Sequence, residues 1–248
     1  MTVAKVHSKW VNGNLVYYQD GQEQRWLDVV GPAVVKVVEE FQFGNYYFTT
    51  TSPKTVQGWL NTFVEAGAGD HVEALVNGAD GGVLLITTAG NDNDGVNKQC
   101  IGEAFNLSLT NKWPAYFGIR FKVSDATESD WVAGLCITDT TLTSAGTTYG
   151  VYFRSADASA VVSAVIEENT TETTGTVHTM SNNTYYIYEF LFDGTSIDFY
   201  VDGVAITQLA TTNIPDTEYL TPSFEYLNGA AGVDTVNIDW IRAFQIQE

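Results

Sequence analysis

Carboxylates close enough to act on one substrate are the first chemistry to look for in this sequence. Two acids about 5–5.5 Å apart can hydrolyse a sugar linkage. Residues two apart on a strand share one face, about 6.5–7 Å apart along the chain. Glu128 with Asp130 lies in a polar stretch typical of a turn, and Asp198 is followed by Asp202 inside an Asp-Gly turn. We interpret these as turn and surface acids, and we predict no catalytic residue and no enzyme activity.

Other catalytic and metal-binding patterns are also lacking. Neither the nucleophile elbow nor the phosphate-binding glycine loop occurs, and no histidine has a Cys or His at metal-ligand spacing; the histidines are His7, His71 and His178. Residues 91–95 (NDNDG) resemble a calcium loop, but its first and twelfth positions would be Gly90 and Ile101. We predict no metal and no cofactor, with a calcium site in this loop as the alternative.

Aromatic side chains make up 13% of the chain. Such residues most often fill a sandwich core or an interface. The alternative is that some line a sugar-binding groove, and the tryptophans whose exposure would decide this are Trp10, Trp26, Trp113 and Trp131.

The charge of the chain excludes one class of partner. Its 30 acidic and 11 basic residues give a net charge of −19. A polyanion would be repelled, so we expect no nucleic-acid binding, and anionic membrane surfaces are disfavoured for the same reason. A solvated acidic surface is the simple interpretation, and an acidic face for a basic partner or divalent cations is the alternative.

The cysteines and the N-terminus bear on the compartment. Cys100 and Cys136 lie among apolar strand residues, which predicts buried free thiols, although their pairing in a disulfide stays open. The N-terminus has no apolar signal-peptide core, and no apolar stretch reaches the roughly 18–20 residues that span a bilayer. We therefore expect synthesis in the cytoplasm and no membrane association.

The second half of the chain has the alternation of an antiparallel β-sheet. Residues 117–123 alternate apolar and polar positions, as a half-buried strand does. Residues 186–192, 197–201 and 204–206 form a three-strand meander whose turns are Asp193-Gly194 and Asp202-Gly203. Strands at this spacing predict an all-β sandwich. Residues 167–179 are interpreted as a solvated loop or a strand edge, with a flexible binding loop as the alternative.

The first 40 residues differ from the rest. Asn12-Gly13 between β-prone residues predicts a hairpin over 7–18, and Asp20-Gly21 predicts another turn. After Gly31-Pro32, residues 33–41 fit either a strand or a short helix. We interpret residues 1–40 as an arm or small docking module and residues 41–248 as the sandwich, with early strands at 59–65 and 83–88.

Several segments resemble known families. Residues 238–245 (IDWIRAFQ) resemble the closing strand of concanavalin-like jelly-roll sandwiches, which include laminarinase-type glucanases. Residues 199–203 (FYVDG) resemble that superfamily and laminin-G-like domains. A longer set resembles virion structural proteins of tailed bacteriophages, and it comprises residues 8–18, 102–105, 116–126, 134–140 and 213–242. The carboxylate signature of the glucanases is absent from the sequence.

The resemblance implies a concanavalin-like jelly roll in a non-enzymatic virion protein. We expect a capsid decoration protein on the outer capsid surface that binds the major capsid protein through its N-terminal arm and forms a homo-oligomer, as a dimer or trimer. The arm residues expected to bind the partner are Trp10, Val11, Leu15, Tyr17, Tyr18 and Trp26. The alternative is a lectin-like module, on a capsid or tail, that binds host-surface glycan.

Overall fold

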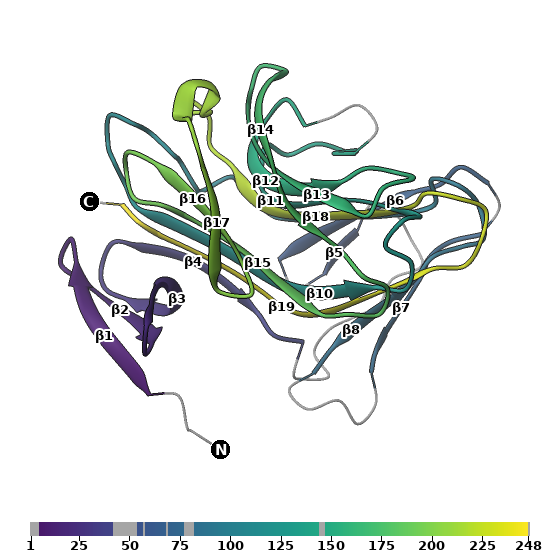
Figure 1. Cartoon of the computed structure of the whole chain (residues 1–248), viewed down its shortest axis with the longest axis horizontal. Coiled ribbons are helices and arrows are strands. Elements are labelled where there is room, and N and C mark those ends of the chain that lie inside the picture. The colour runs from purple at the N-terminus through teal and green to yellow at the C-terminus, as the bar shows by residue number, and fades with distance from the viewer. Residues whose placement is uncertain are drawn as a thin grey trace.

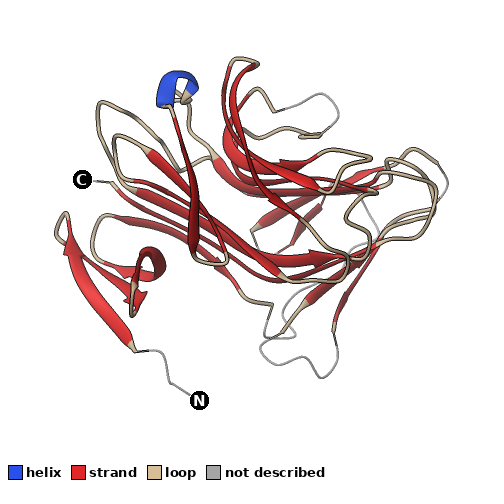
Figure 2. Ribbon diagram, in the orientation of Figure 1, coloured by secondary structure: helices blue, strands red, loops and turns tan. Residues whose placement is uncertain are grey.

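The structure is a computed structural model, and it describes residues 5–41, 54–56 (backbone alone), 58–67, 69–76, 82–143 and 147–247. Within these residues the chain forms 19 strands and one short 3-10 helix, Thr211–Asn213. Two eight-stranded antiparallel sheets stack as a sandwich, and a three-stranded sheet lies at one end (Figures 1 and 2). The predicted all-β sandwich is confirmed.

The N-terminal sheet, which we call the arm, holds β1 (Val6–Val11), β2 (Asn14–Gln19) and β3 (Gln22–Val30) in that order. Asn12 and Gly13 both have positive φ, 43° and 72°, as a two-residue hairpin turn with the twist of its strands requires. Trp10 pairs with Leu15 across this hairpin. The predicted hairpin and the following Asp20-Gly21 turn are both confirmed.

One sheet of the sandwich faces the arm, and we call it the arm-side sheet. Its strand order is β17-β16-β15-β10-β19-β8-β7, and β4 also pairs with β19. Its strands are β4 (Val34–Glu39), β7 (Val72–Leu75), β8 (Leu84–Thr87), β10 (Ala115–Val123), β15 (Tyr186–Phe192), β16 (Ile197–Val201), β17 (Val204–Leu209) and β19 (Thr235–Ile246).

The other sheet, which we call the distal sheet, has the order β14-β13-β12-β11-β18-β9-β6-β5. Its strands are β5 (Lys54–Val56), β6 (Trp59–Val64), β9 (Gly95–Cys100), β11 (Ser129–Cys136), β12 (Tyr149–Ser155), β13 (Val161–Glu168), β14 (Thr171–Thr179) and β18 (Thr221–Asn228).

The main core fills the space between these two sheets. Phe121 of the arm-side sheet meets Trp131 of the distal sheet edge to face, with ring centroids 4.8 Å apart. Phe153 meets Phe199 in the same geometry at 5.4 Å. Aromatic pairs of this kind contribute about 0.5–1.5 kcal/mol beyond the apolar area that they bury, so the aromatic content largely serves the fold.

The structure decides two points about the elements that the sequence left open, and it pairs β4 with the sandwich. Residues 33–41 contain the strand β4, so the strand alternative holds and the helix alternative is wrong. Because β4 pairs with β19, residues 34–39 extend the arm-side sheet while β1–β3 form the separate arm. Residues 167–179 span the end of β13 and the edge strand β14, so the strand-edge interpretation is right and the loop is wrong.

The predicted turn around Glu128 is wrong for Asp130. Asp130 is the second residue of β11 and pairs with Leu227 of β18. The sequence pattern did not show this strand start, because the first two residues of β11, Ser129 and Asp130, are both polar. The meander of β15, β16 and β17 is confirmed, with positive φ at Gly194, Asp202 and Gly203.

Candidate functional site

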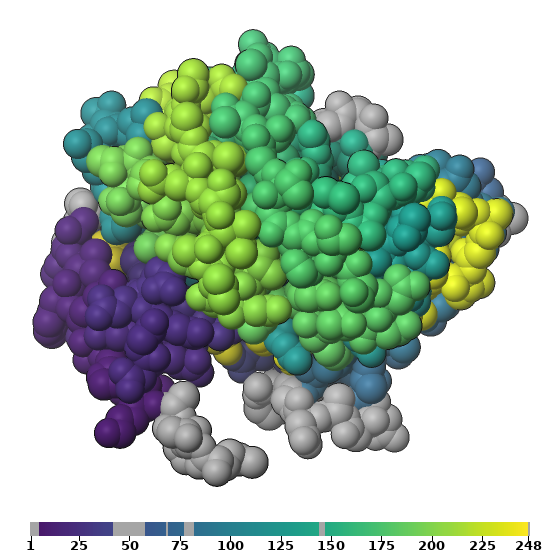
Figure 3. Space-filling model, in the orientation of Figure 1, coloured from purple at the N-terminus to yellow at the C-terminus, as the bar shows by residue number. Residues whose placement is uncertain are grey.

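The arm lies directly against the arm-side sheet, as the space-filling view shows for the N-terminal residues in purple (Figure 3). Trp26 of β3 stacks on Tyr116 of β10 with ring centroids 6.4 Å apart, and Tyr116 stacks on Phe244 of β19 at 5.9 Å. Val16 and Val29 complete this buried cluster from the arm. The arm is therefore packed onto its own sandwich through a second, smaller core.

A buried ion pair also fixes the arm. Arg25 Nε lies 2.8 Å from Glu189 Oε1, and the Tyr116 hydroxyl donates to the same oxygen at 2.6 Å. Arg25 also lies over the ring of Trp240, 5.6 Å from its centroid. Burial and the neighbouring Glu189 carboxylate raise the pKa of Tyr116, so this hydroxyl stays a hydrogen-bond donor.

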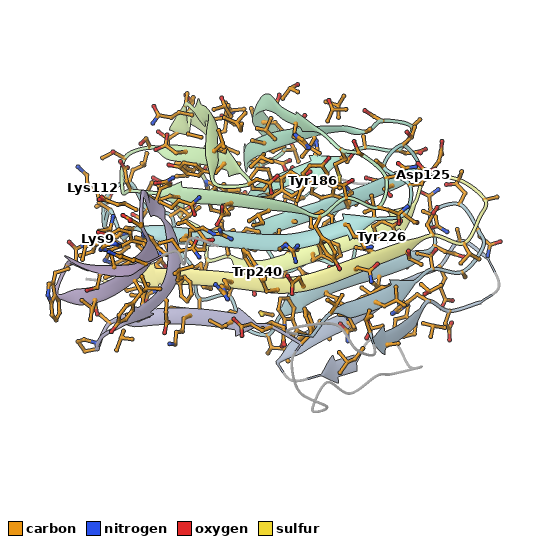
Figure 4. All side chains as sticks on the ribbon, turned by 60° about the horizontal axis from the view of Figure 1, so that its bottom comes forward. Lys9, Lys112, Asp125, Tyr186, Tyr226 and Trp240 are labelled. Atoms are coloured by element: carbon orange, nitrogen blue, oxygen red, sulfur yellow. The ribbon has the colours of Figure 1, made fainter. Side chains whose placement is uncertain are left out.

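A cleft of about 410 Å³ opens where the arm meets the sandwich, and we call it the arm cleft. Figure 4 labels Lys9 and Lys112 at this end of the molecule. The volume falls in the range that small-molecule sites occupy, about 300–1,000 Å³. Arm and sandwich both line it, with apolar and hydrogen-bonding groups: Lys9, Val11, Asn12, Trp26, Asn111, Lys112, Pro114, Leu191 and Asp193.

Two loops hold the sandwich side of the arm cleft in place. Lys112 adopts a left-handed φ of 55°, and its amide donates to the Ser108 carbonyl at 2.8 Å. Gly194 packs so closely on this backbone that a Cβ there would lie 2.7 Å from the Lys112 carbonyl oxygen. The side chain of Lys112 thus starts from a fixed backbone at the rim of the cleft.

Most polar groups of the arm cleft are free to bind a ligand. The Asn111 and Asn12 side-chain amides and the Lys112 ammonium make no hydrogen bond to any part of the chain that the structure describes. Asp193 differs, because its Oδ1 accepts from Thr195 and Ser196 within its own turn. Burial alone would raise its pKa, but these hydrogen bonds outweigh burial and lower it.

Trp26 carries a buried polar group without a partner beside the cleft. It lines the cleft, is 2% exposed, and its indole Nε1–H has no acceptor within the described ranges. A buried donor without an acceptor costs about 1–3 kcal/mol. Such groups are therefore rare in folded proteins, and those that occur often have a functional role.

The outer face of the distal sheet is covered rather than open. Leu142, from the segment after β11, packs on a cluster that includes Val132 and Tyr152. Glu225 Oε2 accepts the backbone amides of Leu142 and Thr143, and Gln99 donates to the Ile137 carbonyl at 3.0 Å. The segment 137–143 is therefore bonded to the sheet across much of this face.

On the same face of the distal sheet lies a pair of carboxylates that the sequence did not reveal. Glu225 pairs with Val132, two residues from Asp130 on β11, so the two acids are diagonal neighbours on one face. Burial raises the pKa of Glu225 to about 7, and burial with the nearby charge of Asp157 raises that of Asp130 to about 6. Glu225 is fully buried and bonded to the covering segment, so its first role is to hold that segment.

The sequence-predicted partner residues fall on two faces of the arm. Trp10, Leu15 and Val30 form a cross-strand row on the side away from the sandwich, which we call the outer face of the arm. Trp10 is 72% and Val30 51% exposed. Tyr17 lies on the same face of β2 as Leu15.

The remaining predicted residues face the sandwich. Val11 lines the arm cleft, and Trp26 is buried beside it. Tyr18 stacks on His7 at 5.8 Å, with Lys9 over its ring. Of the other tryptophans, Trp131 is in the main core and Trp113 is half-buried.

Each of the three histidines packs or pairs with neighbours in the fold. His7 is exposed beside Asp20, and His178 packs against Tyr186. His71 lies inside the sandwich, 3.4 Å from the Glu73 carboxylate that pairs with Lys98. Among the described residues no three metal-ligating side chains gather.

Both thiols are free, as predicted. Cys100 contacts the main core and Cys136 the opposite side of the distal sheet, so they cannot pair. Burial raises the pKa of each to about 12, which leaves them unreactive as nucleophiles.

No protein-family model and no curated protein matches this chain. Solved structures do match it. A protein of unknown function from Shewanella oneidensis MR-1 has a TM-score of 0.59 at 13% identity, covering 87% of each chain. The Emp47p carbohydrate recognition domain gives 0.54 at 12%, covering 78% of this chain and 90% of that one.

The Emp46p carbohydrate recognition domain in its potassium-bound form gives a TM-score of 0.53 at 10% identity, covering 82% of this chain and 95% of that one. Identities this low show the fold alone. The chain thus has the fold of concanavalin-like, lectin-type β-sandwich domains, as its sequence predicted. None of the described helices is long and apolar enough to cross a membrane.

Proposed function

We propose that this protein is a non-enzymatic, carbohydrate-binding β-sandwich module and that its sugar site is the arm cleft. The lining of the cleft carries the proposal. The half-buried Val11 and Leu191 offer apolar surface to the C–H groups of a sugar ring, and the amide of Asn111 can bond its hydroxyls.

Two of the solved structures with this fold support the proposal that the chain binds carbohydrate. The Emp46p and Emp47p domains that share the fold are carbohydrate recognition domains. In this chain the segment 137–143 covers the outer face of the distal sheet. The arm cleft is therefore more accessible to a ligand than that face.

A glycan array with the whole chain, followed by calorimetry on the best ligand, tests the proposal. Asn111→Ala removes one hydrogen-bonding amide from the cleft, and we expect it to weaken binding about three- to tenfold. Gln208→Ala is the matched control, because Gln208 is an exposed amide on β17 that does not line the cleft. An array without any bound glycan would remove the proposal.

We propose as a second function that the chain decorates the outer capsid surface of a tailed phage, where its arm binds the major capsid protein. The resemblance of residues 8–18 and 116–126 to virion proteins motivates this, and the outer face of the arm supports it. A row with the exposed Trp10 and Val30 on either side of the half-buried Leu15 is the kind of apolar patch that marks protein contacts. The edge strand β1 also offers unpaired backbone for strand addition.

Co-sedimentation with mature capsids stripped of this protein tests the second function. We expect saturable binding at a fixed number per capsid, lost in Trp10→Ala and kept in Val204→Ala, an exposed valine of β17. If Trp10→Ala binds as well as the native chain, the arm is not the attachment surface.

A further inference from the structure

Two lysines meet at the arm cleft although basic residues are scarce in this chain. Lys9 comes from β1 and Lys112 from the loop before β10, 103 residues later (112 − 9), and both line the cleft. The chain has 11 basic against 30 acidic residues. The fold thus places a positive pair at the mouth of a site in a strongly negative molecule.

Neither lysine is neutralised by a carboxylate. Lys9 Nζ donates to the Glu23 carbonyl at 3.1 Å and lies 5.6 Å from the Tyr18 ring centroid, and both contacts leave its charge intact. Lys112 has no ion pair with any carboxylate in the part of the chain that the structure describes. Most other basic side chains of the described sandwich are paired, among them Lys98, Arg120, Arg154 and Arg242.

Among the described residues that line the cleft, the one acid is already hydrogen-bonded. Asp193 Oδ1 accepts the Thr195 and Ser196 amides, each at 2.8 Å, and the Thr195 hydroxyl at 2.8 Å. Its Oδ2 accepts the Ser196 hydroxyl at 3.2 Å. It therefore fixes the turn that supports Lys112. Because its pKa is lowered it stays ionised, so the two ammonium groups and this carboxylate leave one net positive charge among the described lining residues.

We propose that the ligand of the arm cleft is an anionic saccharide, whose acidic group binds Lys9 and Lys112 while its ring lies on the apolar wall. The inference rests on the proposed sugar-binding function and adds the ligand class to it. A neutral sugar needs only amides and apolar surface, which Asn111, Val11 and Leu191 already supply. Two unpaired ammonium groups match a carboxylate or sulfate, since charge-assisted hydrogen bonds are the stronger ones.

The net charge makes this assignment more specific. A chain with a charge of −19 repels anions at a distance, so an acidic sugar binds only where the local potential is positive. At 0.15 M salt the screening length is about 8 Å. Direct contacts with the two lysines then outweigh the charges elsewhere on the surface.

Calorimetric titration of the full chain with matched pairs of oligosaccharides tests the inference. The pairs are uronic-acid or sialic-acid oligosaccharides with their carboxyl-reduced forms, and sulfated oligosaccharides with their desulfated forms. We expect an acidic member to bind at least tenfold more tightly than its neutral partner. Comparing the carboxylated pairs with the sulfated pairs shows whether carboxylate or sulfate is the recognised group.

Three variants place the effect at the cleft. Lys112→Gln keeps the length of the side chain and the backbone of the loop, and we expect it to weaken acidic-sugar binding about ten- to hundredfold. Lys9→Gln should act in the same direction. Lys122→Gln is the charge-matched control, because Lys122 lies on β10 near Tyr185 and outside the cleft, and it should leave binding unchanged.

The outcomes separate the two proposals. Equal binding of acidic and neutral members, with Asn111→Ala still weakening it, overturns the anionic ligand and keeps the sugar site. If Lys112→Gln and Lys122→Gln reduce the preference for acidic members equally, the preference comes from the overall charge of the protein. That result also overturns the inference. No binding of any member overturns the proposed function together with the inference.

Discussion

Glu225 is the side chain on which the covering segment of the distal sheet depends. It is fully buried, its Oε2 accepts two backbone amides, and its Oε1 has no partner in the described structure. Burial raises its pKa from 4.5 to about 7. The folded state therefore prefers the protonated acid, and ionisation works against folding.

The sign of the pH effect follows from this shift. Because the folded pKa lies above the unfolded one, the stabilisation by Glu225 is complete below about pH 4.5 and is lost as the pH rises to about 7. Glu225→Gln keeps an oxygen for the two amides and has no charge. We expect it to match the native chain at pH 4 and to exceed its free energy of unfolding by about 2–3 kcal/mol at pH 8. Urea unfolding at five pH values measures this difference.

Glu225→Ala is the complementary variant, because it leaves both amides without an acceptor. It should be less stable than the native chain by about 1–3 kcal/mol at pH 4. This deficit should shrink toward pH 8, where the native chain carries the ionised carboxylate. A constant difference between Glu225→Gln and the native chain from pH 4 to 8 would contradict the assignment of the raised pKa to this group.

The sequence alone could not reveal this role. Glu225 stands between Phe224 and Tyr226, which is the pattern of an outward, solvated position on a half-buried strand. The alternation was interpreted correctly and the side chain does point away from the main core, but residues 137–143 fold over it. Such covering is a long-range contact, and no local pattern encodes it.

At the scale of elements, the arm is held by one ion pair that is almost free of solvent. The side chains of Arg25 and Glu189 are 14% and 2% exposed. Removing one partner of a buried pair leaves a charge without compensation, at a cost of about 3–5 kcal/mol. We expect Arg25→Met to loosen the arm by this amount, seen as faster proteolysis near residues 31–33 and a lower melting temperature.

The exposed pair of Lys36 and Asp28 provides the control for that variant. Its side chains are 45% and 44% exposed, so Lys36→Met should change stability by less than about 1 kcal/mol. The double variant Arg25→Met with Glu189→Gln should recover part of the loss, since no buried charge remains. If Arg25→Met is as mild as Lys36→Met, the ion pair does not hold the arm.

Two truncations test where the arm ends. Deleting residues 1–32 removes β1–β3 and keeps β4, whereas deleting 1–40 also removes β4 from β19. Val35 and Val37 of β4 contact the main core, so the longer deletion should be less stable than the shorter one by at least about 2 kcal/mol. Thermal unfolding of the two chains side by side measures this, and equal stability would place the boundary at residue 40.

The elements were largely predictable because their signals are local. Asn12-Gly13 and Asp202-Gly203 favour tight turns through positive φ, and the alternation from 186 to 192 predicts a strand without tertiary information. Their pairing was not predictable. The strand β19 bonds to β10, β8 and β4, which begin 120, 151 and 201 residues earlier (235 minus 115, 84 and 34). The arm cleft arises from the packing of the arm on the sandwich, which also joins segments far apart in the chain, so only its residue types were visible.

At the scale of the whole molecule, the charge of −19 and the outer face of the arm act against each other. Each chain repels its copies, while Trp10, Leu15 and Val30 offer an apolar row that association would bury. If this face mediates the proposed dimer or trimer, self-association must strengthen with salt. The screening length falls from about 30 Å at 0.01 M to about 3 Å at 1 M, which removes the repulsion and leaves the apolar contact.

Sedimentation velocity at both salt concentrations measures that dependence. We expect the native chain to shift toward a dimer or trimer at 1 M salt and Trp10→Ala to stay monomeric. Val204→Ala, which trims an exposed valine on β17, should behave as the native chain does. Association that weakens with salt would instead indicate contacts between opposite charges, and the outer face of the arm would then have to bind a partner other than a second copy of this chain.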